Sequence, residues 1–307
     1  MKISIVVSSY NGAEYVLEQL ESIKMQKLQA DEVLIFDDGS KDDTVSMVQG
    51  YIAQNQLLNW KIMQNAQNKG WRRNFIEGIA EASGELIFPC DQDDIWEPDK
   101  LKVMHDIMVA HPEIDLLTSN CWAFYDDGTT TIKPGKNDGK LEKKPAMLDL
   151  FEIPYPGCTY CIRRSFAKKC APYWEEDFPH DALYWRIATF AGTAYAINKP
   201  LIKWRRHLSS TFTQESIQSK TYESKLIWLE YADRVISSLQ RFLDEFQKTN
   251  SNELSILRRN REWIKLRRRF YEEKHIFEGI RLLGSLRIYP RKRQYLGDWY
   301  LVYFKKR

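Results

Sequence analysis

The chain has 307 residues, of which 43% are hydrophobic and 28% are charged, and its formal net charge is +3. This hydrophobic fraction is enough to build a sizeable core, so global disorder is excluded. Mean hydropathy is −0.51, and no apolar run in the sequence approaches the roughly 18 residues that a membrane-spanning helix needs.

Charge is divided unevenly along the chain. Residues 254–307 contain 16 Lys and Arg and 5 Asp and Glu, a net charge of +11, which leaves −8 for residues 1–253. The pattern predicts an acidic body with a basic C-terminal tail. Met1-Lys2 leads directly into a β-like run without a signal-peptide pattern, so we expect a cytoplasmic protein.

The first 120 residues alternate between the hydrophobic periods of strands and helices. Strands are predicted at 3–7, 32–36, 60–63, 85–88 and 114–118, and helices at 16–23, 44–54, 71–82 and from Pro98, at helix position N1, to about Ala110. Strands that alternate with helices imply right-handed crossovers, and therefore an α/β fold with a mostly parallel sheet.

The pattern changes after residue 120. Residues 126–144 read as a loop or hairpin, residues 148–212 mix short strands and helices, and from Tyr222 apolar residues recur at helical spacing. We therefore divide the chain into 1–120, 121–215 and a helical, basic extension over 216–307.

Acidic and polar residues follow three of the predicted strands. The first strand is followed by Ser8-Ser9-Tyr10-Asn11, the second by Asp37-Asp38-Gly39-Ser40 and the fourth by Asp91-Gln92-Asp93-Asp94. In an open parallel sheet the carboxyl ends of the strands form the ligand-binding edge, so we expect these turns to meet there.

Carboxylates gathered at one edge repel one another unless a cation neutralises them. A hard divalent cation, Mn²⁺ or Mg²⁺, held by carboxylates while it binds substrate phosphates, is the usual solution. The edge thus predicts a site for a metal-bound nucleotide diphosphate. Asp91 and Asp93 form a D-x-D, Tyr10 can stack on a base, and Asp38 can accept hydrogen bonds from the base or the ribose.

Two alternatives bear on this edge. Asp37, Asp38 and Asp94 can instead cap the helices that follow them, because Asp is a common N-cap residue. The glycine-rich fingerprints of dinucleotide-binding and P-loop proteins are absent from the sequence, which argues against both of those folds.

Four stretches of the first 110 residues resemble family 2 glycosyltransferases, which are inverting enzymes with the GT-A fold, a Rossmann-like sheet flanked by helices. They are Val6 to Asn11, Phe36 to Ser40 with Asp42 and Thr44, Asn68-Lys69-Gly70 with Asn74, and Asp91 to Trp96 with Pro98, Lys100 and Leu101. A later match, at His180-Asp181, Pro200 to Ile202 and Trp204 to His207, resembles the branch that contains bacterial rhamnosyltransferases.

The resemblance implies roles for individual residues. Nucleotide binding falls to Ser8, Tyr10, Asn11, Asp38, Gly70, Asn74 and Asp91. The D-x-D of Asp91 and Asp93 would hold the metal, with Asp93 the more direct ligand and His207 a possible third. Arg205 would lie near the diphosphate, Trp96 flanks the donor edge, and Asp181 would be the general base.

Inverting transfer needs a carboxylate that takes the proton of the acceptor hydroxyl, in addition to the carboxylates that hold a metal. Asp181 meets this need, since it is far from the D-x-D in the chain. From the residues alone, a carboxylate that merely complements a helix dipole is the alternative. Cys158 and Cys161 form a lone C-x-x-C, which we interpret as part of a small buried segment behind the acceptor site.

The basic tail interleaves Arg and Lys with Trp, Tyr and Leu, as do helices that lie on anionic membranes. We expect it to bring the chain to the inner face of the cell membrane as a peripheral protein, with homodimerisation as the alternative. No nucleic-acid motif accompanies these residues, so nucleic acid is not an expected partner.

Together these features predict an inverting, metal-dependent glycosyltransferase. It would move a sugar from dTDP-rhamnose or a UDP-hexose to a glycan or lipid-linked acceptor in bacterial surface polysaccharide synthesis, such as capsule or O-antigen. A non-catalytic nucleotide-sugar-binding partner of a glycosyltransferase complex is the alternative from another class. A nucleotidyltransferase is disfavoured because its basic glycine-rich N-terminal loop is missing from the sequence.

Overall fold

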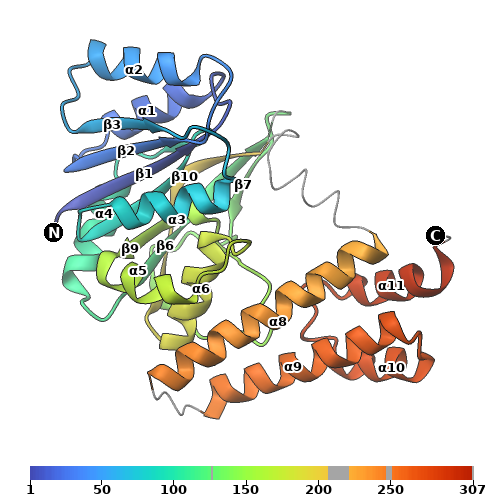
Figure 1. Cartoon of the computed structure of the whole chain (residues 1–307). Coiled ribbons are helices and arrows are strands. Elements are labelled where there is room, and N and C mark those ends of the chain that lie inside the picture. Colours follow the sequence, from blue (N-terminus) through green and yellow to red (C-terminus); the bar gives the residue numbers. More distant parts are fainter. Residues whose placement is uncertain (126, 207–220, 247–250, 306–307) are drawn as a thin grey trace. The chain divides into compact units, whose positions relative to one another are not determined.

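The computed structural model describes residues 1–125, 127–206, 221–246 and 251–305 (Figure 1). The chain divides into two compact units. The first comprises residues 1–145 and 154–206, and the second comprises 146–153 and 207–307. We call them the sheet unit and the helical unit. The predicted boundary at residue 215 and the predicted metal ligand His207 lie outside the described residues.

The first half of the sheet unit forms a parallel sheet. Its strands are β1 (Ile3–Ser9), β2 (Glu32–Asp37), β3 (Trp60–Gln64) and β4 (Leu86–Asp91), in the order β3-β2-β1-β4. The intervening helices are α1 (Val16–Lys24), α2 (Thr44–Gln54) and α3 (Trp71–Glu81). This confirms the predicted alternation, and it places β1 at the centre, paired with β2 on one side and β4 on the other.

The second half of the sheet mixes directions. Strand β9 (Tyr160–Arg163) runs antiparallel between β4 and β6 (Leu116–Tyr125), and β10 (Ala194–Arg206) pairs parallel with β6. Strands β5 (Ile95–Trp96) and β8 (Leu141–Lys143) pair with β10, and β7 (Thr130–Lys133) forms the predicted hairpin with β6. The sheet is therefore Rossmann-like only in its N-terminal half.

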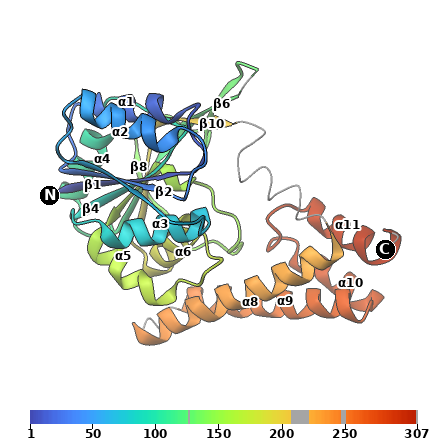
Figure 2. The same cartoon turned by 45° about the horizontal axis from the view of Figure 1, so that its top comes forward.

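Helices cover both faces of this sheet. Figure 2 shows α1, α2 and α4 (Lys100–Ala110) on one face, and α3, α5 (Arg164–Cys170) and α6 (His180–Ala191) on the other. Alternating residues of a strand point to opposite faces. Accordingly Ile5 and Val7 pack in the core with α1 and α4, whereas Val6 lies against Gly78 of α3. Both faces of β1 are thus buried.

The helix predicted to begin at Pro98 begins two residues later. Asp99 occupies the N-cap position, and the first helical hydrogen bond runs from the Val103 amide to the Asp99 carbonyl. The carbonyl of Pro98 instead accepts from the Lys27 amide, 2.9 Å away, so Pro98 belongs to the loop.

The helical unit consists of α8 (Tyr222–Glu245), α9 (Ser251–Glu272), α10 (Ile276–Arg281), the 3-10 turn η3 (Leu282–Ser285), α11 (Arg293–Trp299) and the π-helical turn η4 (Tyr300–Phe304). It also holds the segment 146–153, which lies far away in sequence. Phe151 packs edge-on against Trp228, 4.8 Å between ring centroids, and the Asn260 side chain donates to the Leu148 carbonyl. The tail is therefore a folded unit with its own core.

A buried ion pair lies at the centre of the helical unit. Arg267 donates to both carboxylate oxygens of Asp298 at 2.6 Å, and the hydroxyls of Tyr271 and Tyr289 donate to the same carboxylate. The guanidinium lies 5.0 Å from the ring of Trp228. Every oxygen of the buried Asp298 carboxylate is thus hydrogen-bonded, as a buried charge requires.

We predict that Arg267→Met lowers the free energy of unfolding by about 3–5 kcal/mol, because Asp298 is left as an uncompensated buried charge. The matched control is Arg268→Met at the next position. Its partner Asp233 is part-exposed, so the loss should be about 0–1 kcal/mol. Urea denaturation followed by tryptophan fluorescence measures both variants, and equal losses would contradict the central role of the buried pair.

Candidate active site

The three polar turns predicted to meet do meet at one edge of the sheet. In the strand register Ser8 of β1 pairs with Asp91 of β4, and Ser9 pairs with Asp37 of β2. The parallel strands end together, so the turns that follow them share the carboxyl edge. This edge is where the candidate site is built.

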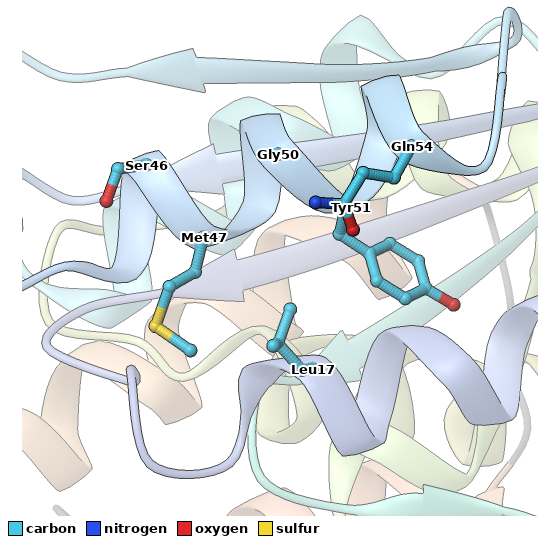
Figure 3. Close-up of a pocket in the computed structure, with 6 residues that line it drawn as sticks. All are labelled: Leu17, Ser46, Met47, Gly50, Tyr51 and Gln54. Atoms are coloured by element: carbon cyan, nitrogen blue, oxygen red, sulfur yellow. The ribbon is translucent and has the colours of Figure 1, made fainter.

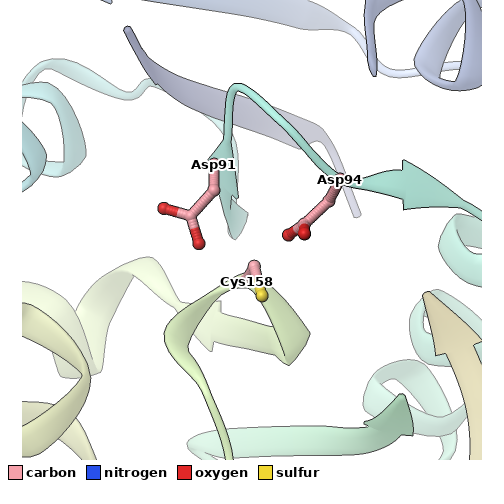
Figure 4. Close-up of side chains that lie close together, drawn as sticks. All are labelled: Asp91, Asp94 and Cys158. Atoms are coloured by element: carbon pink, nitrogen blue, oxygen red, sulfur yellow. The ribbon is translucent and has the colours of Figure 1, made fainter. Parts of the chain in front are cut away.

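The centre of the site is a group of closely spaced ligand atoms from Asp91, Asp94 and Cys158 (Figure 4). These atoms all lie within 4.8 Å of one another. Asp91 ends β4 and is part-exposed, Asp94 is fully buried, and Cys158 belongs to the 3-10 turn η1 (Gly157–Thr159). Asp93 is outside this tight group, although its charge acts on both aspartates.

Enclosure by protein raises the pKa of Asp91 to about 7, and the charges of Asp93 and Asp181 push it in the same direction. Burial raises the pKa of Asp94 well above its usual range, again reinforced by the neighbouring aspartates. Carboxylates that repel one another in a poorly hydrated place bind either protons or a cation. The edge is therefore poised to take up positive charge.

Asp181 reaches the same site from a different part of the chain. It lies in the first turn of α6, is part-exposed, and accepts a hydrogen bond from the Ala182 amide at 2.7 Å. Burial raises its pKa, while that hydrogen bond and the charges of Arg186 and Arg72 lower it. Asp181 lies against Gly157, the residue before Cys158, whose sulfur is grouped with Asp91 and Asp94, and its charge raises the pKa of Asp91.

A close backbone contact holds the start of α6 against η1. A β-carbon built on Gly157 would lie 2.4 Å from Nε2 of His180 and 3.1 Å from Cβ of Asp181, so only glycine fits there. His180 is buried with its ring 4.1 Å from that of Phe75, and burial lowers its pKa to about 3. A neutral, packed His180 thus fixes the position of Asp181.

The predicted nucleotide residue Asp38 is buried and acts on the loop after β3. Its carboxylate accepts hydrogen bonds from the amides of Lys69 and Gly70, both at 2.8 Å, and from the side chain of Asn65. Gly70 adopts φ +88° at the N-cap position of α3, a conformation that favours glycine. Asp38 therefore fixes the shape of the 68–70 turn.

The predicted residues Ser8 and Asn74 belong to the same hydrogen-bond network. The Asn74 amide donates to the Ser8 hydroxyl at 2.7 Å and to the Phe36 carbonyl, while its oxygen accepts from Asn65. Asn65 links Asp38 to Asn74, and it is not among the site residues predicted from the sequence. It is the polar residue directly after β3, so the pattern that identified the other three turns also applies to it.

The turn after β1 exposes one aromatic ring to solvent. Tyr10 is 43% exposed, and its backbone is bound on both sides by the Gln92 side chain, which accepts from the Tyr10 amide and donates to its carbonyl. Asn11, at φ +46°, accepts from the Lys41 amide and donates its own amide to Ser40. The middle residue of the D-x-D, Gln92, thus positions an aromatic ring available for stacking.

Arg205 pins the D-x-D turn to β10. Its amide donates to Asp94 at 3.0 Å, its Nε donates to the Asp93 carbonyl at 2.8 Å, and its guanidinium forms an ion pair with Glu18. Trp96, also predicted at the donor edge, is 2% exposed and lies in the core beside Lys100. A ring buried this deeply offers almost no surface to a donor.

The C-x-x-C segment is buried, as expected, but one of its thiols faces the candidate site. Cys161 lies on β9 in the core, whereas the Cys158 sulfur joins Asp91 and Asp94. Buried Lys100 donates to the Cys158 carbonyl at 2.5 Å. Burial raises the pKa of the Cys158 thiol well above its usual value, so it remains protonated.

The donor atoms at this edge suit a hard cation. Asp91 and Asp94, with Asp93 close by, offer carboxylate oxygens, the ligands preferred by Mg²⁺ and Mn²⁺. One oxygen of Asp94, Oδ2, is buried without a hydrogen-bond partner among the described residues. A buried carboxylate oxygen without a hydrogen-bond partner is costly, and a bound cation would remove that cost.

A separate hollow of about 330 Å³ lies between α1 and α2, lined by Leu17, Ser46, Met47, Gly50, Tyr51 and Gln54 (Figure 3). Its lining has no carboxylate and no histidine, and the Tyr51 hydroxyl donates to Glu21 at 2.6 Å. The hollow therefore offers none of the groups that make the strand edge reactive.

Comparison with solved structures identifies the fold. The chain is similar to the crystal structure of S. aureus TarS 1-349 with a TM-score of 0.57 and 19% identity, covering 97% of this chain and 88% of that one. For the same protein in complex with UDP-GlcNAc the TM-score is 0.59 at 18% identity, with the same coverage. At this level of identity the likeness shows the fold, and it is the predicted GT-A fold.

Sequence comparison then gives the family. The protein-family model described as glycosyl transferase family 2 matches residues 4–171, more than half of the chain. The chain belongs to this family, which confirms the resemblance seen in its motifs. The match ends before Asp181 and Arg205, so it does not bear on these two residues.

Curated relatives agree in kind. The dTDP-rhamnosyl transferase RfbG of Shigella flexneri is 28% identical over 217 residues, 66% of this chain and 71% of that protein. The relative named "Putative glycosyltransferase EpsH", from Bacillus subtilis, is 29% identical over 255 residues, 80% of this chain and 72% of that protein.

We predict that Gly157→Ala lowers transfer activity roughly a hundredfold, because the added methyl group displaces His180 and with it the carboxylate of Asp181. Gly50→Ala in α2 is the matched control, since a β-carbon there meets nothing within 4 Å. Initial rates and melting temperatures of both variants should be compared. A Gly157→Ala enzyme as active as the control would contradict this contact.

Proposed function

We propose that the chain is an inverting glycosyltransferase that uses dTDP-rhamnose or a UDP-hexose as donor and a glycan or lipid-linked sugar as acceptor. The observation that carries the proposal is that the start of α6, with Asp181, packs against Gly157, the residue before Cys158, whose sulfur lies with the carboxylates of Asp91 and Asp94. Transfer needs a base that is separate from the residues that stabilise the leaving group, and this arrangement supplies both.

In the proposed reaction the Asp181 carboxylate accepts the proton of the acceptor hydroxyl. The acceptor oxygen forms a bond to the anomeric carbon on the face opposite the diphosphate, and the bond between that carbon and the diphosphate oxygen breaks. Its electron pair stays on the nucleoside diphosphate. The raised pKa of Asp181 makes it a better base than an ordinary exposed aspartate.

The metal of the proposal is Mn²⁺ or Mg²⁺. Asp91, Asp93 and Asp94 would hold it, and when bound it would offset the negative charge that develops on the leaving diphosphate. His207, predicted as a further ligand, lies outside the described residues. Arg205 acts by holding the turn that carries Asp93 and Asp94.

The nucleotide is proposed to bind along the carboxyl ends of β1 and β2. The exposed ring of Tyr10 would stack on the base, and the buried Asp38 carboxylate would act on the base or ribose through the 68–70 turn that it fixes. Asn11, Gly70, Ser8 and Asn74 shape that surface through the hydrogen bonds described above.

The proposed donor is supported by relatives. RfbG is named a dTDP-rhamnosyl transferase, and TarS has been solved with UDP and with UDP-GlcNAc. We propose that the product belongs to a bacterial surface polysaccharide such as capsule or O-antigen. The protein would work in the cytoplasm, peripherally bound to the inner face of the membrane.

A thermal-shift screen of nucleotide sugars tests the proposal, because a bound donor stabilises the fold by mass action. A concentration of a hundred times Kd contributes about 2.7 kcal/mol. We expect dTDP-rhamnose or a UDP-hexose to raise the melting temperature with Mn²⁺ present and to lose this effect in EDTA. Stabilisation that survives EDTA would contradict the metal, and no stabilisation by any nucleotide sugar would contradict the donor class.

We expect Asp181→Asn to bind the donor normally and to lose transfer by roughly 10²–10⁴-fold, the usual contribution of a general base. Calorimetry measures donor affinity, and chromatography of the reaction products measures transfer. Asp177→Asn, which changes a carboxylate in the loop before α6, serves as the control. Turnover of Asp181→Asn within a fewfold of the native chain would refute its role as base and favour a non-catalytic binding partner.

A further inference from the structure

The last part of the helical unit exposes large apolar side chains along one stripe. On α10 and η3 these are Ile276, Phe277, Ile280 and Leu283, of which Phe277 is 74% exposed. Their spacing puts them on one side of the helix, while Gly279 and Leu282 on the other side are buried. The stripe is therefore the outward face of an amphipathic helix.

A second stripe runs along α11 and η4. Leu296, Tyr300, Tyr303 and Phe304 are exposed, and Phe304 reaches 72%. Asp298 and Val302 lie between them in sequence and are buried, as is Tyr295 just before them. Single exposed apolar residues are ordinary on a protein surface, whereas two stripes on consecutive elements are not.

The two stripes lie on neighbouring elements of the helical unit. The Tyr303 hydroxyl donates to the carbonyl of Lys274, just before α10, and the Tyr295 hydroxyl donates to the Gly279 carbonyl at 3.1 Å. A β-carbon on Gly279 would lie 2.5 Å from the Trp299 ring, so the helices touch there. The start of α10 is consequently beside the end of η4.

The charges between residues 276 and 305 are arranged asymmetrically. The acidic residues are Glu278, which bridges to Arg269 and Arg281, and Asp298, which is buried with Arg267. Exposed cations belong to the same elements and their loop: Arg281, Arg287, Arg291, Lys292, Arg293 and Lys305. The elements that display the apolar stripes, together with their connecting loop, thus expose six cations, while their two acidic residues are ion-paired.

We propose that the exposed side of α10, η3, α11 and η4 is a docking surface for an anionic lipid bilayer. Its aromatic side chains would enter the headgroup region, and the surrounding Arg and Lys would pair with lipid phosphates. In the described residues no helix is both long and apolar enough to cross a membrane. A contact between two copies of this chain would instead bring these cations together, which charge repulsion opposes.

The inference rests on the proposed peripheral membrane location and is independent of the transfer chemistry. Flotation of the full chain is measured with vesicles of phosphatidylcholine alone and with phosphatidylglycerol added. We expect binding only to the anionic vesicles, weakened by salt. Phe277→Ser combined with Phe304→Ser should reduce the bound fraction roughly tenfold or more. Each Phe side chain would move its apolar surface from water into the bilayer, and Ser removes that favourable transfer.

Leu58→Ser is the matched control, since Leu58 is 94% exposed on the sheet unit and should not affect flotation. Replacing Arg291, Lys292 and Arg293 with Gln should also weaken binding to the anionic vesicles. Flotation of the double Phe variant equal to that of the control would overturn the proposal. So would light scattering that shows a native dimer converted to a monomer by the same variant. Donor hydrolysis is expected to be unchanged in all variants. Reduced flotation with intact hydrolysis concerns the docking surface alone, whereas no hydrolysis by the native chain would concern the proposed transferase function.

Discussion

Repulsion between carboxylates is the constraint on which the site of this protein depends. Asp91, Asp93, Asp94 and Asp181 share one edge of the sheet, where enclosure raises the pKa of Asp91, Asp94 and Asp181. Such a group costs folding free energy unless protons or a cation compensate it. The fold supplies partial compensation, through the Arg205 amide at Asp94 and the charge of buried Lys100 near Asp91, and the uncompensated negative charge favours the uptake of positive charge.

The surrounding hydrogen bonds keep this edge in shape when no ligand is bound. Asp38 fixes the 68–70 turn, Asn74 and Asn65 connect the ends of the strands, and Gln92 ties the turn after β1 to the D-x-D. Residues that family resemblance marks as nucleotide contacts therefore have a structural role as well. Substitutions at Asp38 or Asn74 would alter the surface offered to the donor even if neither side chain touched it.

The helical unit shows how a basic tail can be folded and still present charge. Its most buried cation, Arg267, is satisfied by Asp298 and by aromatic rings, while the cations of its last helices remain at the surface beside exposed aromatic side chains. The segment 146–153, which belongs to this unit, is continuous in the chain with η1 of the site. A short stretch of backbone thus connects the helical unit to the candidate site.

The sequence by itself determined the alternation of strands and helices up to Ala110, the three polar turns at the strand edge and the family, because hydrophobic period and local motifs depend on neighbouring residues. Tertiary structure decided the rest. It brought Cys158 and Asp181 to an edge that is far away in sequence, placed Trp96 in the core, and inserted antiparallel β9 into the sheet. It also drew residues 146–153 into the helical unit. These outcomes depend on long-range packing and close contacts such as Gly157 against His180, which no local pattern encodes.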